Sequence, residues 1–308
     1  EPVPYVPTGD AADDCGSYVH LKCGLPEATT KPGDCYVLTQ QCPFLCGSLA
    51  FNCHAVNESC MDGGFIADAD VDLDCSICLN GVGRSTEGHA RIDCTGEDLG
   101  AYFAAAAELE DASVHAFVRL RAELADLGAP RSLRRSAGAA ARDERRHTRA
   151  TTRLARRFGA RAARARVADV GRRTLLEIAI ENAVEGCVRE TFGALVATYQ
   201  AEHARDGGLR RELGRIARDE ARHAALGWAI ARWFDARLDA DARARVAAAA
   251  RDAVEDLARA PSLSETLGGG AAGLPDASAR RALVAGLRAS LWDRDLGRRS
   301  RRDSASAA

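Results

Sequence analysis

Long apolar runs and a signal-like leader are both missing from this 308-residue chain. No stretch approaches the roughly 18 consecutive apolar residues that a membrane helix needs, so the sequence predicts no transmembrane segment. No charged-then-apolar leader opens the chain, and its first residue is Glu1 rather than Met. We therefore expect a mature or trimmed chain whose targeting segment has already been removed.

The chain also lacks an excess of positive charge, since its formal net charge is −2. Residues 1–96 contain 14 acidic and 4 basic residues, whereas the remainder contains 30 acidic and 38 basic residues. A nucleic-acid-binding protein normally has a dominant basic surface, so this balance argues against a nucleic-acid partner. The opposite charges of the two parts fit either attraction between two domains or two independently solvated surfaces.

Cysteine is almost absent after residue 96, where Cys187 is the only one. Residues 1–96 are instead rich in Cys, Gly, Pro and Asp, and they show no sustained helical period. This composition predicts a small, loop-rich, disulfide-rich domain and an extracytoplasmic location, either periplasmic, cell-surface or secreted, with or without a lipid anchor. The disulfide candidates are Cys15, Cys23, Cys35, Cys42, Cys46, Cys53, Cys60, Cys75, Cys78 and Cys94.

A zinc-binding alternative stays open for this region. Cys42 and Cys46 are separated by three residues, and Cys75 and Cys78 by two, spacings that suit halves of a zinc site. Ten cysteines are too many for one tetrahedral site, which favours disulfides. With only one Cys-Xaa-Xaa-Cys pair present, a rubredoxin-like electron-donor domain is not expected.

From about residue 97 the sequence becomes rich in Ala, Leu, Arg and Glu, which are strong helix formers. Four helices of about 30 residues are expected, each long enough for a helical bundle. They cover about 97–127, 130–158, 172–203 and 209–238. Short links make the first and second helices, and likewise the third and fourth, antiparallel hairpins.

Further helices are expected at about 240–260 and 276–296, and the last residues, 298–308, are expected to be disordered. The predicted fold class is therefore an all-α four-helix bundle over 97–238 with accessory carboxy-terminal helices over 239–297. The disulfide-rich domain precedes this bundle.

One motif occurs twice in the expected helices. Arg-Asp-Glu-Xaa-Arg-His spans residues 142–147 and again 218–223. With 18 Glu and 7 His in the chain, chance predicts less than one Glu-Xaa-Xaa-His match. Two matches inside one longer motif therefore indicate an internal duplication of a helix hairpin. Surface positions in i, i+4 charge ladders are the alternative interpretation, but they leave the duplication unexplained.

Each hairpin also has a glutamate in its first helix. The interval along the chain from Glu110 to Glu144 is nearly the same as that from Glu185 to Glu220. Residues at this separation in an antiparallel hairpin lie at about the same height, and the helical neighbours of Glu110 and Glu185 are apolar. Four glutamates and two histidines should therefore meet in the bundle core. The local alternatives are Glu108 in the first helix, and Glu181 and Glu190 in the third.

Four buried carboxylates need compensating charge, and two divalent cations would supply it. Over about residues 97–238 this set resembles the ferritin-like superfamily of di-iron and di-manganese carboxylate bundles. The resemblance implies two iron ions, or manganese in their place, as the cofactor. It implies Glu110 and Glu185 as terminal ligands, Glu144 and Glu220 as bridging ligands, and His147 and His223 as one imidazole ligand per metal ion.

The resemblance also implies partners for the two histidines. Asp143 would accept a hydrogen bond from His223, and Asp219 one from His147, which fixes the orientation of each imidazole ring. Glu181, one turn before Glu185, is a candidate for an additional ligand.

A di-iron centre with open positions binds O2 or peroxide between two redox-active metal ions. The function expected from the resemblance is thus an O2- or peroxide-dependent oxidoreductase with a reductant or small substrate as its further partner. Metal binding or iron sequestration without turnover is one alternative, although the additional Cys-rich domain would crowd a storage cage. A secreted interaction module with the bundle as scaffold is the other.

Overall fold

The structure is a computed structural model that describes residues 19–21, 52–55, 71–76, 84–90, 98–260, 262, 264 and 270–294. The chain divides into two compact units, Glu1–Leu79 and Asn80–Ala308. Composition places the boundary near residue 96, whereas residues 84–90 belong to the second unit. The tail expected at 298–308 lies outside the described residues.

The first unit contains a three-stranded antiparallel sheet. Its strands are β1 (Val19–Leu21), β2 (Asn52–Ala55) and β3 (Val71–Ser76), in the order β1-β3-β2. In the register of β2 and β3, Cys53 is opposite Cys75. The other eight disulfide candidates lie outside the described residues, so the disulfide prediction remains a prediction.

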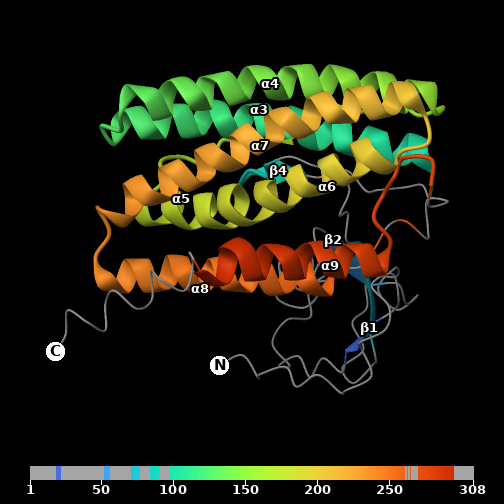
Figure 1. The fold of residues 1–308 in the computed structure, drawn as a ribbon. Coiled ribbons are helices and arrows are strands. Elements are labelled where there is room, and N and C mark those ends of the chain that lie inside the picture. Colours follow the sequence, from blue (N-terminus) through green and yellow to red (C-terminus); the bar gives the residue numbers. More distant parts are fainter. Residues whose placement is uncertain are drawn as a thin grey trace, which may run out of the picture. The chain divides into compact units, whose positions relative to one another are not determined.

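The second unit is mostly helical, and its described part contains six helices that pack in pairs (Figure 1). The helical spans are α3 (Leu99–Asp126), α4 (Arg131–Arg157), α5 (Leu175–Glu181) continued by η2 (Asn182–Arg189) and α6 (Glu190–His203), α7 (Gly207–Asp235), α8 (Ala240–Arg259), and α9 (Ala277–Leu287) continued by η3 (Arg288–Trp292). α3 packs on α4, and α6 packs on α7. A two-residue strand, β4 (His89–Ala90), pairs with β5 (Arg166–Val167) in the link between the two hairpins. The six helical spans expected from the sequence are confirmed.

Aspartates begin most of these helices. Asp98, Asp206, Asp239 and Asp276 each accept a hydrogen bond from the backbone N–H three residues further along. This contact satisfies one of the backbone donors that a helix leaves unpaired at its first turn. α3 ends just before Gly128, which has a φ of +70° that favours glycine.

The long helix over residues 175–203 is interrupted by the π-helix η2. Here η2 approaches α7 so closely that a Cβ atom on Gly227 would lie 2.7 Å from the carbonyl carbon of Gly186. The side-chain amide of Asn182 donates to the carbonyl of Gly227 at 2.9 Å and ties the crossing together. A π-helix has more residues per turn than an α-helix, so it changes which later side chains face α7.

Two apolar clusters fill the core, with a polar layer between them. Toward one end of α3, α4 and α7 lie Tyr102, Phe103, Leu154, Leu209 and Leu213. Toward the other end lie Phe117, Leu120, Ala137, Ala141, Leu226 and Ile230. The glutamates and histidines of the duplicated motif lie between these clusters. No helix in the described residues is both long and apolar enough to span a bilayer.

Candidate metal centre

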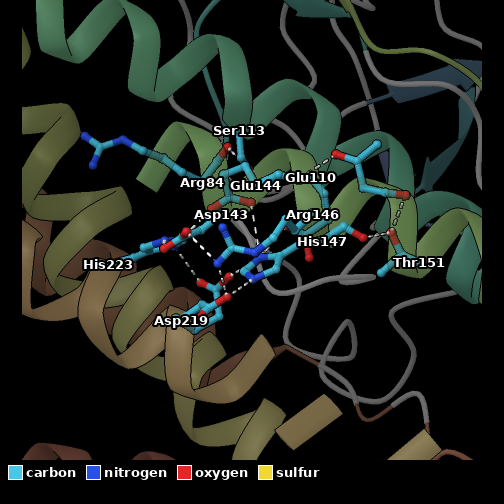
Figure 2. Close-up of polar contacts among 12 residues, drawn as sticks. Arg84, Glu110, Ser113, Asp143, Glu144, Arg146, His147, Thr151, Asp219 and His223 are labelled. Carbon is cyan, nitrogen blue, oxygen red and sulfur yellow. Dashed lines mark hydrogen bonds and ion pairs between the residues drawn. The ribbon is translucent and has the colours of Figure 1, made fainter. Parts of the chain in front are cut away.

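Four side chains of the polar layer form a compact group that could hold a metal ion. Glu110 comes from α3, Glu144 and His147 from α4, and Glu220 from α7, and one ligand atom of each lies within 4.8 Å of the others. All four are at most 2% exposed. The i, i+3 spacing of Glu144 and His147 places both on one helix face, beside Glu110 (Figure 2).

The two motif glutamates lie between the two histidines. Glu144 presents Oε2 to His147 Nδ1 at 3.5 Å and Oε1 to His223 Nδ1 at 3.0 Å. Glu220 presents Oε1 to His147 Nδ1 at 3.1 Å and Oε2 to His223 Nδ1 at 3.5 Å. Each carboxylate therefore directs one oxygen toward His147 and the other toward His223. This arrangement suits a bridging ligand.

The outer nitrogen of each histidine faces an aspartate from the opposite motif helix. His147 Nε2 lies 3.1 Å from Asp219 Oδ2, and His223 Nε2 lies 3.5 Å from Asp143 Oδ2. The same two pairs are those that the family resemblance implies. Because the outer nitrogens face carboxylates, both Nδ1 atoms are directed toward the glutamates (Figure 2).

The second arginine of each motif links these aspartates, a role that the sequence reasoning did not assign. Arg146 contacts Asp143 at 2.7 Å and Asp219 at 3.0 Å. Arg222 contacts the same two carboxylates, Asp143 at 3.2 Å and Asp219 at 2.5 Å. The signal was present in the sequence, since this arginine occupies the same place in both copies of the motif.

The hydrogen bonding and the charge of the four-residue group are compatible with a bound cation. Glu110 Oε2 and the carboxylate oxygens of Glu144 and Glu220 form no well-directed hydrogen bond within the described residues, and the histidine Nδ1 atoms lie 3.0–3.5 Å from them. Burial, with the nearby charge of Glu144, raises the pKa of Glu110 well above its usual value. The surrounding carboxylates raise the pKa of both histidines although burial opposes this. A metal ion would satisfy these buried hydrogen-bond acceptors and would balance the negative charge of the carboxylates.

Glu185 does not join this group in the structure. Its Oε1 accepts a hydrogen bond from Arg189 at 2.6 Å, and its Oε2 accepts one from the backbone N–H of Ser85 at 3.0 Å. Both oxygens therefore have partners away from the motif glutamates.

Two other candidates from the sequence are also held elsewhere. Glu181 pairs with Arg84 at 3.2 Å and with Arg173. Glu108, the alternative to Glu110, contacts His89 Nε2 at 2.5 Å. Neither carboxylate belongs to the compact group around His147.

Glu190 is a further buried glutamate of the third helix. It is 1% exposed, and neither of its oxygens has a hydrogen-bond partner among the described residues. Burial raises its pKa to about 8, and its charge interacts with those of His223, Glu220 and Glu144. The sequence named Glu190 only as an alternative to Glu185.

The height of Glu190 explains this placement. Glu190 precedes the end of α6, at His203, by a certain number of residues. Glu220 follows the start of α7, at Gly207, by the same number. Glu190 and Glu220 therefore lie at matching heights on either side of the link between α6 and α7. Glu185 lies more than a helical turn further from that link, inside the π-helix. Equal spacing along the chain does not give equal height here, because Glu185 is 18 residues before the end of α6 whereas Glu220 is 13 residues after the start of α7.

A surface groove of about 270 Å³ lies between α4 and α7 and has His147 in its lining. His147 and Asp219 contribute to its lining, together with Arg146, Arg149, Arg153 and Arg215. His147 therefore connects the buried carboxylates to an arginine-rich surface.

Comparison with protein-family models, with characterised proteins and with solved structures gives no match to this chain. The class of the second unit therefore rests on its own fold and site. It is a mostly helical domain with a buried carboxylate and histidine cluster that could hold a metal ion.

Proposed function

We propose that the helical unit is a ferritin-like di-metal carboxylate protein that binds two iron or manganese ions. The observation that supports this most directly is the placement of Glu144 and Glu220, each with one oxygen toward His147 and the other toward His223. Histidine nitrogen and carboxylate oxygen suit iron and manganese, and no thiolate is part of the described group.

The proposed ligands divide into two halves that share the motif glutamates. One half adds Glu110, which lies 3.5 Å from His147 Nδ1. For the other half we propose Glu190, because it lies at the height of Glu220 and is buried without a hydrogen-bond partner among the described residues. Glu190 takes the place that the sequence argument gave to Glu185.

We propose further that the centre is an O2- or peroxide-dependent oxidoreductase. Two iron ions bound here would supply redox chemistry with O2 or peroxide. The protein orients the histidines through Asp143 and Asp219, and the apolar clusters on both sides keep bulk water from the carboxylates. The groove over His147 offers a surface at which a reductant or small substrate can approach.

Metal content per chain after anaerobic Fe(II) loading and desalting is the first test. We expect two iron ions for the natural protein and none for the E144A/E220A double variant, with helicity retained in circular dichroism. Glu212→Ala is the matched control, because Glu212 is on α7 but pairs with Arg153 and Arg215 at the surface. Near-zero iron in the natural protein would refute the proposal.

Oxygen consumption separates the two functions proposed for a metal-loaded centre. An oxidoreductase should consume O2 repeatedly when a chemical reductant is supplied. A single stoichiometric uptake, or none, would instead support metal binding or sequestration without turnover.

The extracytoplasmic location is proposed separately, from the ten cysteines before residue 96. Thiol titration of the unfolded, unreduced protein should find about one reactive thiol per chain if those cysteines form disulfides. Many reactive thiols would favour the zinc alternative and a reducing compartment.

A further inference from the structure

The outward face of α4 carries charge of one sign. This helix contains ten arginines, whereas its two acidic residues, Asp143 and Glu144, are buried. α8, in the same unit, instead has four arginines and four acidic residues. Every exposed residue of α4 is arginine or serine, and nine are arginines: Arg131, Arg135, Arg142, Arg145, Arg146, Arg149, Arg153, Arg156 and Arg157. The excess is therefore a property of α4 and not of every helix in this arginine-rich chain.

α7 extends this face sideways. Residue numbers rise along α4 as they fall along α7 in the ion pairs that join the two helices, which are Arg146–Asp219 at 3.0 Å, Arg153–Glu212 at 3.4 Å and Arg157–Asp206 at 3.0 Å. These pairs occupy the acidic residues along the line where the helices meet. The same half of α7 has five exposed arginines, Arg210, Arg211, Arg215, Arg218 and Arg222. Two neighbouring antiparallel helices thus present one broad basic face, which we call the arginine face.

Several arginines of this face have no carboxylate to balance them. Within the part of the chain that the structure describes, Arg135, Arg145, Arg149 and Arg156 form no ion pair. Arg145, Arg149 and Arg153 follow one another at i, i+4 spacing, and like charges at this spacing destabilise a helix. A partner that brings many negative charges to the face would relieve this repulsion.

The form of the arginine face favours a planar anionic surface over other polyanions. The face is two helices wide, and the 27 residues of α4 give it a length of about 40 Å. Among the described residues, the large apolar side chain that is exposed is Val118 on α3, so the face has no apolar anchor of the kind that dominates protein–protein binding. Its exposed residues include no aromatic ring on which the bases of a single strand could stack. The proposed extracytoplasmic location also separates the protein from nucleic acid.

We infer that the arginine face binds the surface of a bilayer that contains anionic phospholipids. Guanidinium groups form charge-assisted hydrogen bonds with phosphate oxygens, and clusters of basic residues are attracted to a negatively charged membrane surface. A face with arginine and no large exposed apolar side chain rests on the headgroups and does not enter the hydrocarbon. The groove lined by His147 opens on this face, so docking would bring the groove to the headgroup region. The inference rests on the proposed location but not on the metal centre.

Co-sedimentation with lipid vesicles tests the inference. At low ionic strength the natural chain should bind vesicles of phosphatidylcholine mixed with phosphatidylglycerol, and it should not bind vesicles of phosphatidylcholine alone. High salt should release the protein, because at 1 M salt exposed charges are screened beyond about 3 Å. The triple variant R145Q/R149Q/R156Q should lower the partition coefficient about 100-fold, since each arginine near the surface contributes about fivefold.

Two further variants separate the face from net charge and from fold. R145K/R149K/R156K keeps the charge and should keep most of the binding. R245Q/R251Q/R281Q removes three exposed arginines from α8 and α9 and should leave binding unchanged. All of these positions are exposed, so circular dichroism should show the same helicity in every variant.

Three outcomes would overturn the inference. The first is no binding to the phosphatidylglycerol vesicles, or binding that does not need phosphatidylglycerol. The second is an equal loss of binding in the two glutamine variants, which would make net charge the cause. The third is binding to duplex DNA without binding to the vesicles, which would make nucleic acid the partner. None of these outcomes changes the iron content expected for the metal centre, so the two proposals fail separately.

Discussion

Gly227→Ala should destabilise the helical unit, although alanine is the better helix former. At this position α7 crosses η2, and the new Cβ atom would lie 2.7 Å from the carbonyl carbon and 2.8 Å from the Cα and O atoms of Gly186. These are backbone atoms, so no side-chain rotation relieves the contact. The helices must separate, which also lengthens the hydrogen bond from Asn182 to the Gly227 carbonyl.

The expected magnitude follows from two opposing effects. Overpacking a close contact costs typically about 1–3 kcal/mol, and a backbone contact belongs at the upper end of that range. Alanine returns up to about 1 kcal/mol through its higher helix propensity. The net loss of unfolding free energy should be about 2 kcal/mol, which corresponds to roughly 4–8 °C in Tm for a domain of this size.

Gly214→Ala is the matched control on the same helix. There the new Cβ atom meets the Ala201 Cβ at 3.7 Å and Arg218 Nη1 at 3.9 Å, which are ordinary contacts. Urea and thermal unfolding followed by circular dichroism should show Gly214→Ala as stable as the natural protein or up to about 1 kcal/mol more stable. If Gly227→Ala is stabilised to the same extent, the close crossing of η2 and α7 does not exist.

Three further outcomes are expected. Asp206→Asn keeps the helix cap but loses the charge, and hydrogen bonds from an α4 arginine and from the backbone hold the Asp206 pKa below its ordinary 3.8. Its carboxylate therefore adds stability above pH 3.8 that is lost as the pH falls. In urea unfolding, the free energy of unfolding of Asp206→Asn should be lower than that of the natural protein at pH 7, and the difference should shrink in acid. A difference that does not depend on pH would contradict this. Asp219→Asn removes the charged partner of His147 and should weaken metal binding about 10- to 100-fold in a titration, whereas unchanged affinity would show that the ring is oriented otherwise. Tyr102→Phe deprives the Gln200 amide of an acceptor and should cost about 1 kcal/mol in urea unfolding, and an unaltered midpoint would count against that hydrogen bond.

Local patterns in the sequence were sufficient to predict the helices and most residues of the cluster. The spacing of Glu144 and His147, repeated by Glu220 and His223, puts each pair on one helix face regardless of what packs there. Glu110 joins the compact group, as its spacing from Glu144 predicts. These inferences succeed because helix geometry depends on neighbours along the chain.

Tertiary contacts decided that Glu185 stays outside the compact group. Glu185 lies inside the π-helix, where Arg189 and the backbone N–H of Ser85 take both of its carboxylate oxygens. Arg84 reaches the core from a segment that precedes α3, and no local pattern marks it as buried. The sequence by itself determined the helices and the duplicated ligand motif, because both follow from short-range spacing. Only the tertiary structure decided the partners of Glu185 and the burial of Arg84, because both depend on how closely two helices pack and on which distant segment fills the space between them.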